Sequence, residues 1–296
     1  MNMKHTEGTL FGVNNLSIFR QSWVPLNPRA VVVIAHGLGE HSGRYAHVVE
    51  HLCALGCAVY ALDHRGHGRS AGPRAYVDRF AHAVSDLDQL VDLARREQRT
   101  SSLKRPLFLL GHSMGGALAL SYTLKFQGKL DGLILSGAAV ALDGAPPLMK
   151  PLAKLLSVLA PKLGMFHVQA ELISRDPAVV AGYNSDPLNC HGKVPARTLG
   201  EIVNLVEWLP AALSVLKLPM LVMHGGADKL AGVAGSERVF ARAGSADKTL
   251  KIYDDLYHEI FNELPPDRAR VLLDLGGWIE ARFVLQGAVS GRLKSA

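Results

Sequence analysis

Short apolar runs alternate with amphipathic stretches along most of the chain. Strand-like runs occupy residues 30–35, 58–62, 107–110, 132–136, 220–224 and 249–253. Between them, apolar residues recur at helical spacing over residues 45–54, 80–98, 114–126, 237–243 and 267–283. Two further apolar runs around Asn14 and Asn15 predict a hairpin over residues 9–24. This alternation predicts an α/β fold, with a mostly parallel sheet and helices on both of its faces.

The alternation stops between residues 140 and 217. That segment contains helical pieces with frequent prolines and no clear strand, so we interpret it as an insertion between two strands of the sheet. Ligands of such sheets bind outside the carboxyl ends of the strands, where the insertion would form a lid. We therefore predict a core of residues 1–139 and 218–296 and a helical cap of residues 140–217.

One strand-like run leads into a helix through a turn that holds a serine between glycines. Residues 111–115, GHSMG, fit the pattern G-x-S-x-G in the order strand, turn, helix. A sharp turn lifts the serine Oγ clear of the backbone, and the free N–H groups of the helix start point to the same place. We interpret Ser113 as a nucleophile rather than as part of an ordinary glycine turn, with the N–H of Met114 as an oxyanion donor.

A serine hydroxyl needs a base, and this pattern predicts the order serine, acid, histidine along the chain. Asp228 follows one strand-like run after a glycine turn, and His258 follows the next run. We predict that Asp228 orients His258, which deprotonates Ser113 and later protonates the leaving group. Asp228 could instead cap a turn, and three other carboxylates could replace it: Asp143, Asp254 and Asp255.

The loop after the first predicted parallel strand should supply a second oxyanion donor. It reads AHGLGEHSGRY over residues 35–45, and the N–H of Leu38 is the candidate. Read alone, this loop could pass for a phosphate-binding loop. It has G-x-G without a third glycine and no Walker lysine, so no nucleotide site is expected.

A further loop, ALDHRGHGRS, brings Asp63, His64 and His67 close together in the sequence. Their spacing matches no reliable zinc motif, and the two arginines among them would repel a cation. We interpret this loop as bracing the floor of the active site, and we expect no metal there.

Composition and charge narrow the class of protein. The chain has 296 residues, 48% of them hydrophobic and 20% charged, which suits one large domain or a domain with an insertion. The formal charge of +6 is scattered, so a nucleic-acid partner is not expected. The three cysteines form no metal motif. No signal-peptide core and no membrane-spanning apolar run is visible, so we expect a cytoplasmic protein with reduced thiols.

Several motifs together resemble one family of enzymes. Monoacylglycerol lipases and the related lysophospholipase-like α/β-hydrolases carry similar motifs in the same order: HGLGEHSGRY, ALDHRGHGRS, GHSMGG, YNSDPL, GGADKL and YHEIFNE. The resemblance runs from about residue 10 to residue 283. GHSMGG is common to many hydrolases, whereas HGLGEHSGRY joined to YNSDPL is much more specific. The resemblance implies the α/β-hydrolase fold, the triad Ser113, Asp228 and His258, and the oxyanion donors Leu38 and Met114.

The resemblance also implies an apolar acyl tunnel under the cap, with polar groups that hold glycerol near its end. Glu40, Arg44 and Tyr183 match positions on the glycerol side. Glu40 and Arg44 are four residues apart and could instead pair to brace their loop, and Tyr183 could be packing within the cap. Small residues over 229–236, where bulkier groups are usual, predict a changed pocket shape rather than the loss of the acid.

The implied reaction is hydrolysis of a small amphiphilic lipid ester, monoacylglycerol, to fatty acid and glycerol through an acyl-enzyme. It requires no metal or organic cofactor. The same triad would serve a broad carboxylesterase, a lysophospholipase, a peptidase or a thioesterase. A ligand-binding receptor on this fold is less expected because all three triad members are present, and a dehalogenase would need a carboxylate in place of Ser113. The sequence indicates no particular oligomeric state.

The first helical piece of the cap, residues 147–164, is strongly apolar. Lys150, Lys154 and Ser157 form a narrow polar stripe on it. Its leucines could pack on the sheet below, or they could face outward and make transient contact with a membrane or lipid surface. Periodicity alone does not separate the two arrangements. The leucines are Leu148, Leu152, Leu155, Leu156, Leu159 and Leu163.

Overall fold

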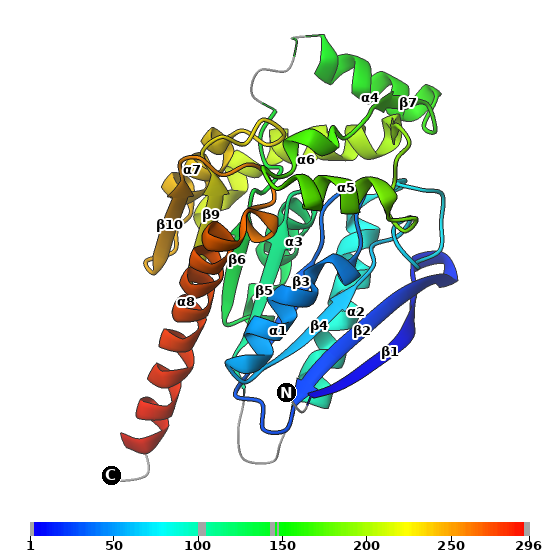
Figure 1. The fold of residues 1–296 in the computed structure, drawn as a ribbon. Coiled ribbons are helices and arrows are strands. Elements are labelled where there is room, and N and C mark those ends of the chain that lie inside the picture. The colour runs from blue at the N-terminus through cyan, green and yellow to red at the C-terminus, as the bar shows by residue number, and fades with distance from the viewer. Residues whose placement is uncertain (1–2, 100–104, 143–145, 147, 293–296) are drawn as a thin grey trace.

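A twisted sheet of eight strands forms the centre of the molecule, seen in a computed structural model that describes residues 3–99, 105–142, 146 and 148–292 (Figure 1). The strand order is β1-β2-β4-β3-β5-β6-β9-β10. β1 and β2 are antiparallel to their neighbours, and the others run parallel to one another. The strands are β1 (Met3–Gly12), β2 (Leu16–Pro25), β3 (Ala30–Ala35), β4 (Cys57–Leu62), β5 (Leu107–His112), β6 (Gly132–Ser136), β9 (Met220–Gly225) and β10 (Lys248–Tyr253).

Helices cover both faces of the sheet, as the alternation predicts. One apolar cluster joins one face to α2, α3 and α7, and a second joins the other face to α1 and α8. Strands β3 to β6 and β9 are buried along their whole length, which explains their unbroken apolar runs. The helices are α1 (Ala46–Ala54), α2 (Phe80–Glu97), α3 (Met114–Phe126), α7 (Val233–Arg242) and α8 (Pro265–Arg292).

The N-terminal hairpin is longer than the predicted residues 9–24. Its register runs from Met3 opposite Pro25 to Gly12 opposite Leu16. β1 lies at the edge of the sheet and is only partly buried, so its first half is polar and gives no apolar signal. Asn14 and Asn15 adopt positive φ angles of 63° and 57° in the turn, a conformation that asparagine tolerates better than most residues.

The segment between β6 and β9 leaves the sheet and lies over the carboxyl ends of its strands (Figure 1). It contains the helices α4 (Met149–Leu159), α5 (Pro177–Ser185) and α6 (Ala196–Ala212). The expectation of no strand here is wrong, because β7 (Gly164–Phe166) and β8 (Val194–Pro195) form a two-stranded antiparallel pair. With three and two residues, these strands are too short to show an alternating pattern.

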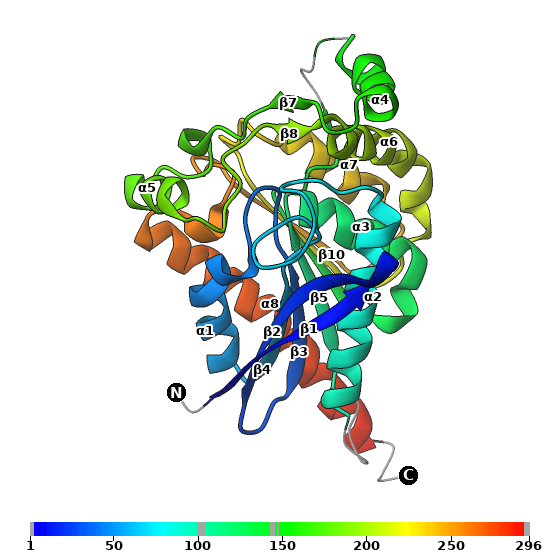
Figure 2. The same ribbon diagram turned by 90° about the vertical axis from the view of Figure 1, so that its right-hand side faces the viewer.

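Helix α4 turns Lys154 and Ser157 of its polar stripe toward α6 and most of its leucines outward. Ala153 and Ser157 are buried against α6, where the Ser157 side chain packs over Gly200. Lys154 forms an ion pair with Glu207 of α6. Helix α4 lies at the outer end of the molecule (Figure 2). The alternative in which the leucines pack on the sheet is wrong, because several apolar side chains in and next to α4 are about half to three-quarters exposed: Leu148, Leu152, Leu155, Val158 and Leu159.

Candidate active site

Ser113 lies in a sharp turn between β5 and α3. Its φ of 52° and ψ of −120° are strained for a residue with a side chain. The turn is possible because the neighbouring chain approaches so closely that only glycine fits. A Cβ atom on Gly115 would lie 2.1 Å from the carbonyl oxygen of Ala35, and one on Gly111 would lie 2.4 Å from that of Gly115. Glycine at positions 111 and 115 therefore allows the tight turn that positions Ser113.

The structure brings Ser113, His258 and Asp228 into one hydrogen-bonded chain. His258 Nε2 lies 2.8 Å from Ser113 Oγ, and His258 Nδ1 lies 2.7 Å from Asp228 Oδ2. The three residues follow β5, β10 and β9, whose carboxyl ends meet at one edge of the sheet. Asp254 and Asp255 are exposed beyond the end of β10, and Asp143 lies outside the described residues.

The environment of Asp228 favours its charged form. Burial raises the pKa of this carboxyl, but the charge of His258, hydrogen bonds from His224 and His258, and a backbone N–H together hold it well below its usual value. Oδ1 accepts hydrogen bonds from the N–H groups of Leu230 at 2.8 Å and Ala231 at 2.9 Å. Burial lowers the pKa of His258, but the charge and hydrogen bond of Asp228 outweigh it, and the pKa lies above its ordinary value. The pair is therefore built to support an imidazolium.

Two buried histidines beside the triad were not predicted. His224 Nε2 lies 3.1 Å from Asp228 Oδ2, and its Nδ1 lies 2.7 Å from Ser236 Oγ. The His112 ring lies 4.7 Å from that of His258, and burial lowers the pKa of His112 to about 3, which keeps it neutral. His112 adjoins the serine in sequence and His224 precedes the glycine turn of Asp228, but neither position alone indicates a contact.

The predicted oxyanion donors lie at the same cavity as Ser113. Met114 is the first residue of α3, so its N–H has no acceptor within the helix. In the loop after β3, the N–H of Gly37 donates to Glu40 Oε1 at 2.6 Å and is already engaged. The N–H of Leu38 is thus the candidate of that loop, and both assignments stay predictions.

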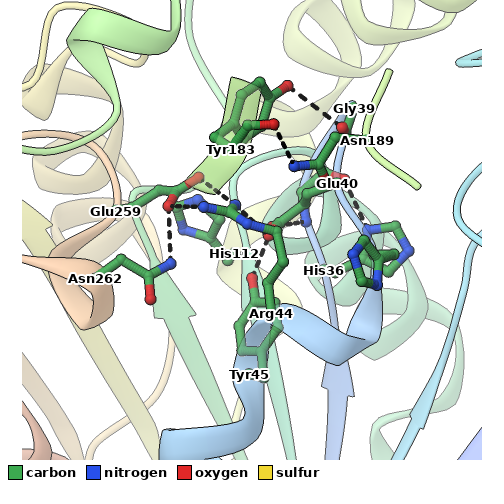
Figure 3. A network of polar contacts seen from close by, with 12 residues as sticks. His36, Gly39, Glu40, Arg44, Tyr45, His112, Tyr183, Asn189, Glu259 and Asn262 are labelled. Atoms are coloured by element: carbon green, nitrogen blue, oxygen red, sulfur yellow. Dashed lines mark hydrogen bonds and ion pairs between the residues drawn. The ribbon is translucent and has the colours of Figure 1, made fainter. Parts of the chain in front are cut away.

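Glu40, Arg44 and Tyr183 also come together beside the site (Figure 3). Arg44 Nη1 lies 2.9 Å from Glu40 Oε2, which is the bracing contact considered from the sequence. The Arg44 guanidinium lies over the Tyr183 ring, 5.0 Å from its centre. Glu40 and Tyr183 also line the cavity. Glu259 was not predicted, yet it pairs with Arg44 and lines the cavity as well.

The histidine-rich loop after β4 is hydrogen-bonded to the loop that carries Leu38 and Glu40. The N–H of His64 donates to His36 Nε2 at 2.9 Å, and Asp63 Oδ1 accepts the N–H of Ser42 at 2.8 Å. These bonds join this loop to the loop after β3. Within the described residues, no group of three or more His, Cys, Asp or Glu side chains is arranged to hold a metal ion.

The cavity above Ser113 has a volume of about 340 Å³ and lies between the sheet and the segment that follows β6. Its polar lining includes Glu40, Glu259 and Tyr183 near the triad, and His167, Gln169 and Lys229 line it as well. Apolar residues from the segment between β6 and β9 form much of the remaining wall: Leu142, Phe166, Val168, Leu172, Ile173, Leu199 and Ile202. None of the helices in the described part of the chain is both long and apolar enough to cross a membrane.

Known proteins share this architecture along nearly the whole chain. A family described as serine aminopeptidase, S33, matches residues 26–265. The chain is 42% identical to a monoacylglycerol lipase of Mycolicibacterium smegmatis over 93% of its own length and 96% of that protein. It is 35% identical to the monoglyceride lipase of Rattus norvegicus, covering 92% and 89% of the two chains. The crystal structure of a soluble monoglyceride lipase variant from Saccharomyces cerevisiae, in complex with a substrate analogue, superposes with a TM-score of 0.84 and 25% identity over 95% of each chain.

Proposed function

The chain belongs to the serine aminopeptidase S33 family of hydrolases, and from this premise we propose that it cleaves monoacylglycerol to fatty acid and glycerol. It is a carboxylic ester hydrolase of the α/β-hydrolase fold. One observation carries the proposal: the hydrogen-bonded chain Ser113–His258–Asp228 ends at a largely apolar cavity. Relatives that are 35–42% identical over most of their length and are named for monoacylglycerol hydrolysis support the choice of substrate.

In the first half of the reaction, Ser113 Oγ attacks the ester carbonyl carbon while His258 Nε2 takes its proton. The carbonyl electron pair moves onto oxygen, where the N–H groups of Leu38 and Met114 stabilise the charge. Collapse of this intermediate breaks the bond to the glycerol oxygen, which receives the proton from His258. Asp228 stabilises the imidazolium in between.

In the second half, the acyl group is transferred from Ser113 to water. His258 takes a proton from the water molecule as its oxygen attacks the acyl carbon, and the same two N–H groups hold the oxyanion. Ser113 then leaves with the proton from His258, and the fatty acid is released.

The substrate would lie with its acyl chain along the apolar wall and its glycerol near Tyr183 and Glu40. The Tyr183 hydroxyl lies at 3.3 Å from the carbonyl oxygen of Gly39, at the alcohol side of the cavity. Glu40 Oε2 receives a hydrogen bond from Arg44 and keeps capacity for a glycerol hydroxyl. Arg44 would act mainly by fixing Glu40, because both of its terminal nitrogens are engaged with carboxylates.

We further propose that residues 140–217 act as a lid whose outer helix contacts lipid. The exposed leucines of α4 support this role, since the transfer of apolar side chains from water into a lipid surface lowers the free energy. Lys150 stands on the same helix and favours an anionic surface. Such contact would place the cavity near the membrane from which an amphiphile is extracted.

The test compares esters that share an acyl chain and differ in the alcohol. We expect purified protein to hydrolyse 1-monooleoylglycerol with a kcat/KM about tenfold or more above that for 1-oleoyl-lysophosphatidylcholine, because the carboxylates near Tyr183 repel a phosphate. A short aryl ester serves as the control for an intact triad. Preference for the lysophospholipid, with the aryl ester still cleaved, would assign the chain to the lysophospholipases instead.

A further inference from the structure

Arg44 is held between two buried carboxylates, Glu40 and Glu259 (Figure 3). Its Nη1 lies 2.9 Å from Glu40 Oε2 and 2.6 Å from Glu259 Oε1, and its Nη2 lies 2.8 Å from Glu259 Oε2. The contact with Glu259 is therefore bidentate, the geometry that fixes both side chains most firmly. The side chains of Arg44 and Glu259 are only 10% and 6% exposed.

The two carboxylates belong to two different loops, whose positions relative to each other matter for the reaction. Glu40 lies in the loop after β3, and its Oε1 accepts the N–H of Gly37, the residue before Leu38. Glu259 directly follows His258 in the chain. Arg44 thus joins the loop of the candidate oxyanion donor to the loop of the general base, although 215 residues separate it from Glu259.

Glu259 is fixed from two more directions. Its Oε2 accepts a hydrogen bond from Asn262 Nδ2 at 2.8 Å. Its backbone N–H donates to the carbonyl oxygen of Ile173, in the segment between β6 and β9, at 2.7 Å. A residue so constrained limits the backbone freedom of its neighbour, so the ring of His258 has little room to move away from Ser113.

The charges around His258 give the cluster a second effect. Asp228 faces the ring from the loop after β9, His112 from the end of β5, and Ser113 from the turn after β5. Tyr183 of α5 and Lys229 line the same cavity. Glu40 and Glu259 carry two negative charges against the single positive charge of Arg44, so the cluster retains one net negative charge. Like Asp228, that charge favours the protonated form of the ring.

We propose that Glu259 is a positioning residue for His258: through Arg44 and Glu40 it locks the histidine loop to the oxyanion loop and supplies a fixed negative charge beside the ring. The proposal rests on the proposed function, in which His258 is the general base. It gives Arg44 the part of a connector between the two halves of the catalytic machinery.

The test replaces Glu259 by glutamine, which keeps the shape and removes the charge. We expect Glu259→Gln to lower kcat on a short aryl ester by about tenfold to a hundredfold, with KM changed by less than about threefold. The acid limb of kcat/KM should move to lower pH, because loss of a negative charge lowers the pKa of His258. Asp86→Asn is the matched control, since Asp86 is a buried carboxylate paired with Arg65, and it should leave the acid limb in place.

Arg44→Lys separates geometry from charge and stands in if the glutamine variant does not fold, as judged by thermal unfolding. Lysine keeps the positive charge but cannot make the two-point contact. We expect kcat to fall while the acid limb stays where it is. A Glu259→Gln enzyme with the kcat and acid limb of the wild type would overturn the proposal, and so would an Arg44→Lys enzyme with unchanged kcat. Because the aryl ester has no glycerol, these results stand even if monoacylglycerol is not the substrate.

Discussion

The backbone of Ser113 is strained, and hydrogen bonds from neighbouring segments stabilise the strained conformation. A positive φ in a residue with a side chain costs on the order of 1–3 kcal/mol. Two backbone hydrogen bonds hold the turn: Ser113 N–H to Ser136 O at 3.0 Å and Ala139 N–H to Ser113 O at 3.0 Å. The G-x-S-x-G pattern predicted this turn from five consecutive residues. Glu259 could not be predicted, because its contacts with Arg44 and Ile173 join segments that only the fold brings together. His224 lies only four residues before Asp228, but spacing alone does not show that the turn after β9 brings the two side chains into contact.

Among the candidate carboxylates that the structure describes, Asp228 is the one that contacts His258, and this gives a direct test at the residue scale. Asp228→Asn keeps the shape but favours the wrong tautomer of the histidine, and we expect kcat to fall by roughly 10⁴-fold. Asp255→Asn is the control, because Asp255 is exposed near the same loop, and its kcat should match the wild type. Steady-state rates on an aryl ester decide the matter, and a large loss in Asp255→Asn with a small one in Asp228→Asn would reverse the assignment.

At the scale of elements, the structure shows which way a helix faces, which periodicity alone leaves open. The pattern of α4 defines two faces but not their directions, and the contacts of Ser157 with Gly200 and of Lys154 with Glu207 turn the leucines outward. The helix predicted over residues 237–243 begins earlier in the structure, at Val233. The prediction missed its first residues because they are small and show little amphipathic pattern. By contrast, strands buried on both faces were predicted closely, since burial leaves an unbroken apolar run.

The outward face of α4 makes the lid testable as a membrane contact. We expect the double variant Leu155→Glu and Leu159→Glu to bind vesicles of mixed neutral and anionic phospholipid about tenfold or more weakly, because each leucine loses its burial in lipid. Leu273→Glu is the matched control, since Leu273 is 69% exposed on α8 and Leu159 is 71% exposed. Sedimentation with vesicles measures the binding, and equal affinities of all variants would remove α4 from the membrane contact. Neither leucine lines the cavity, so rates on a dissolved aryl ester should stay unchanged.

On the scale of the whole molecule, the sheet explains why residues 113, 228 and 258 meet. They follow strands β5, β9 and β10, whose parallel arrangement brings their carboxyl ends to one edge. Two apolar clusters, one on each face, hold that edge rigid. The segment between β6 and β9 then closes the space above it. The mostly parallel sheet could thus be predicted from the alternation along the chain, and the order serine, acid, histidine from its motifs. The shape of the cavity, by contrast, depends on side chains from distant segments.

The most direct measurement of the central claim is oleate release from 1-monooleoylglycerol by the wild type and by Ser113→Ala. We predict steady turnover by the wild type and a loss on the order of a millionfold in the variant. The triad acts as a unit, so His258 and Asp228 contribute little once the nucleophile is removed. Thermal unfolding should show that the variant is folded, because alanine keeps the Cβ atom of serine and removes only the hydroxyl. Turnover by Ser113→Ala within tenfold of the wild type would contradict the account.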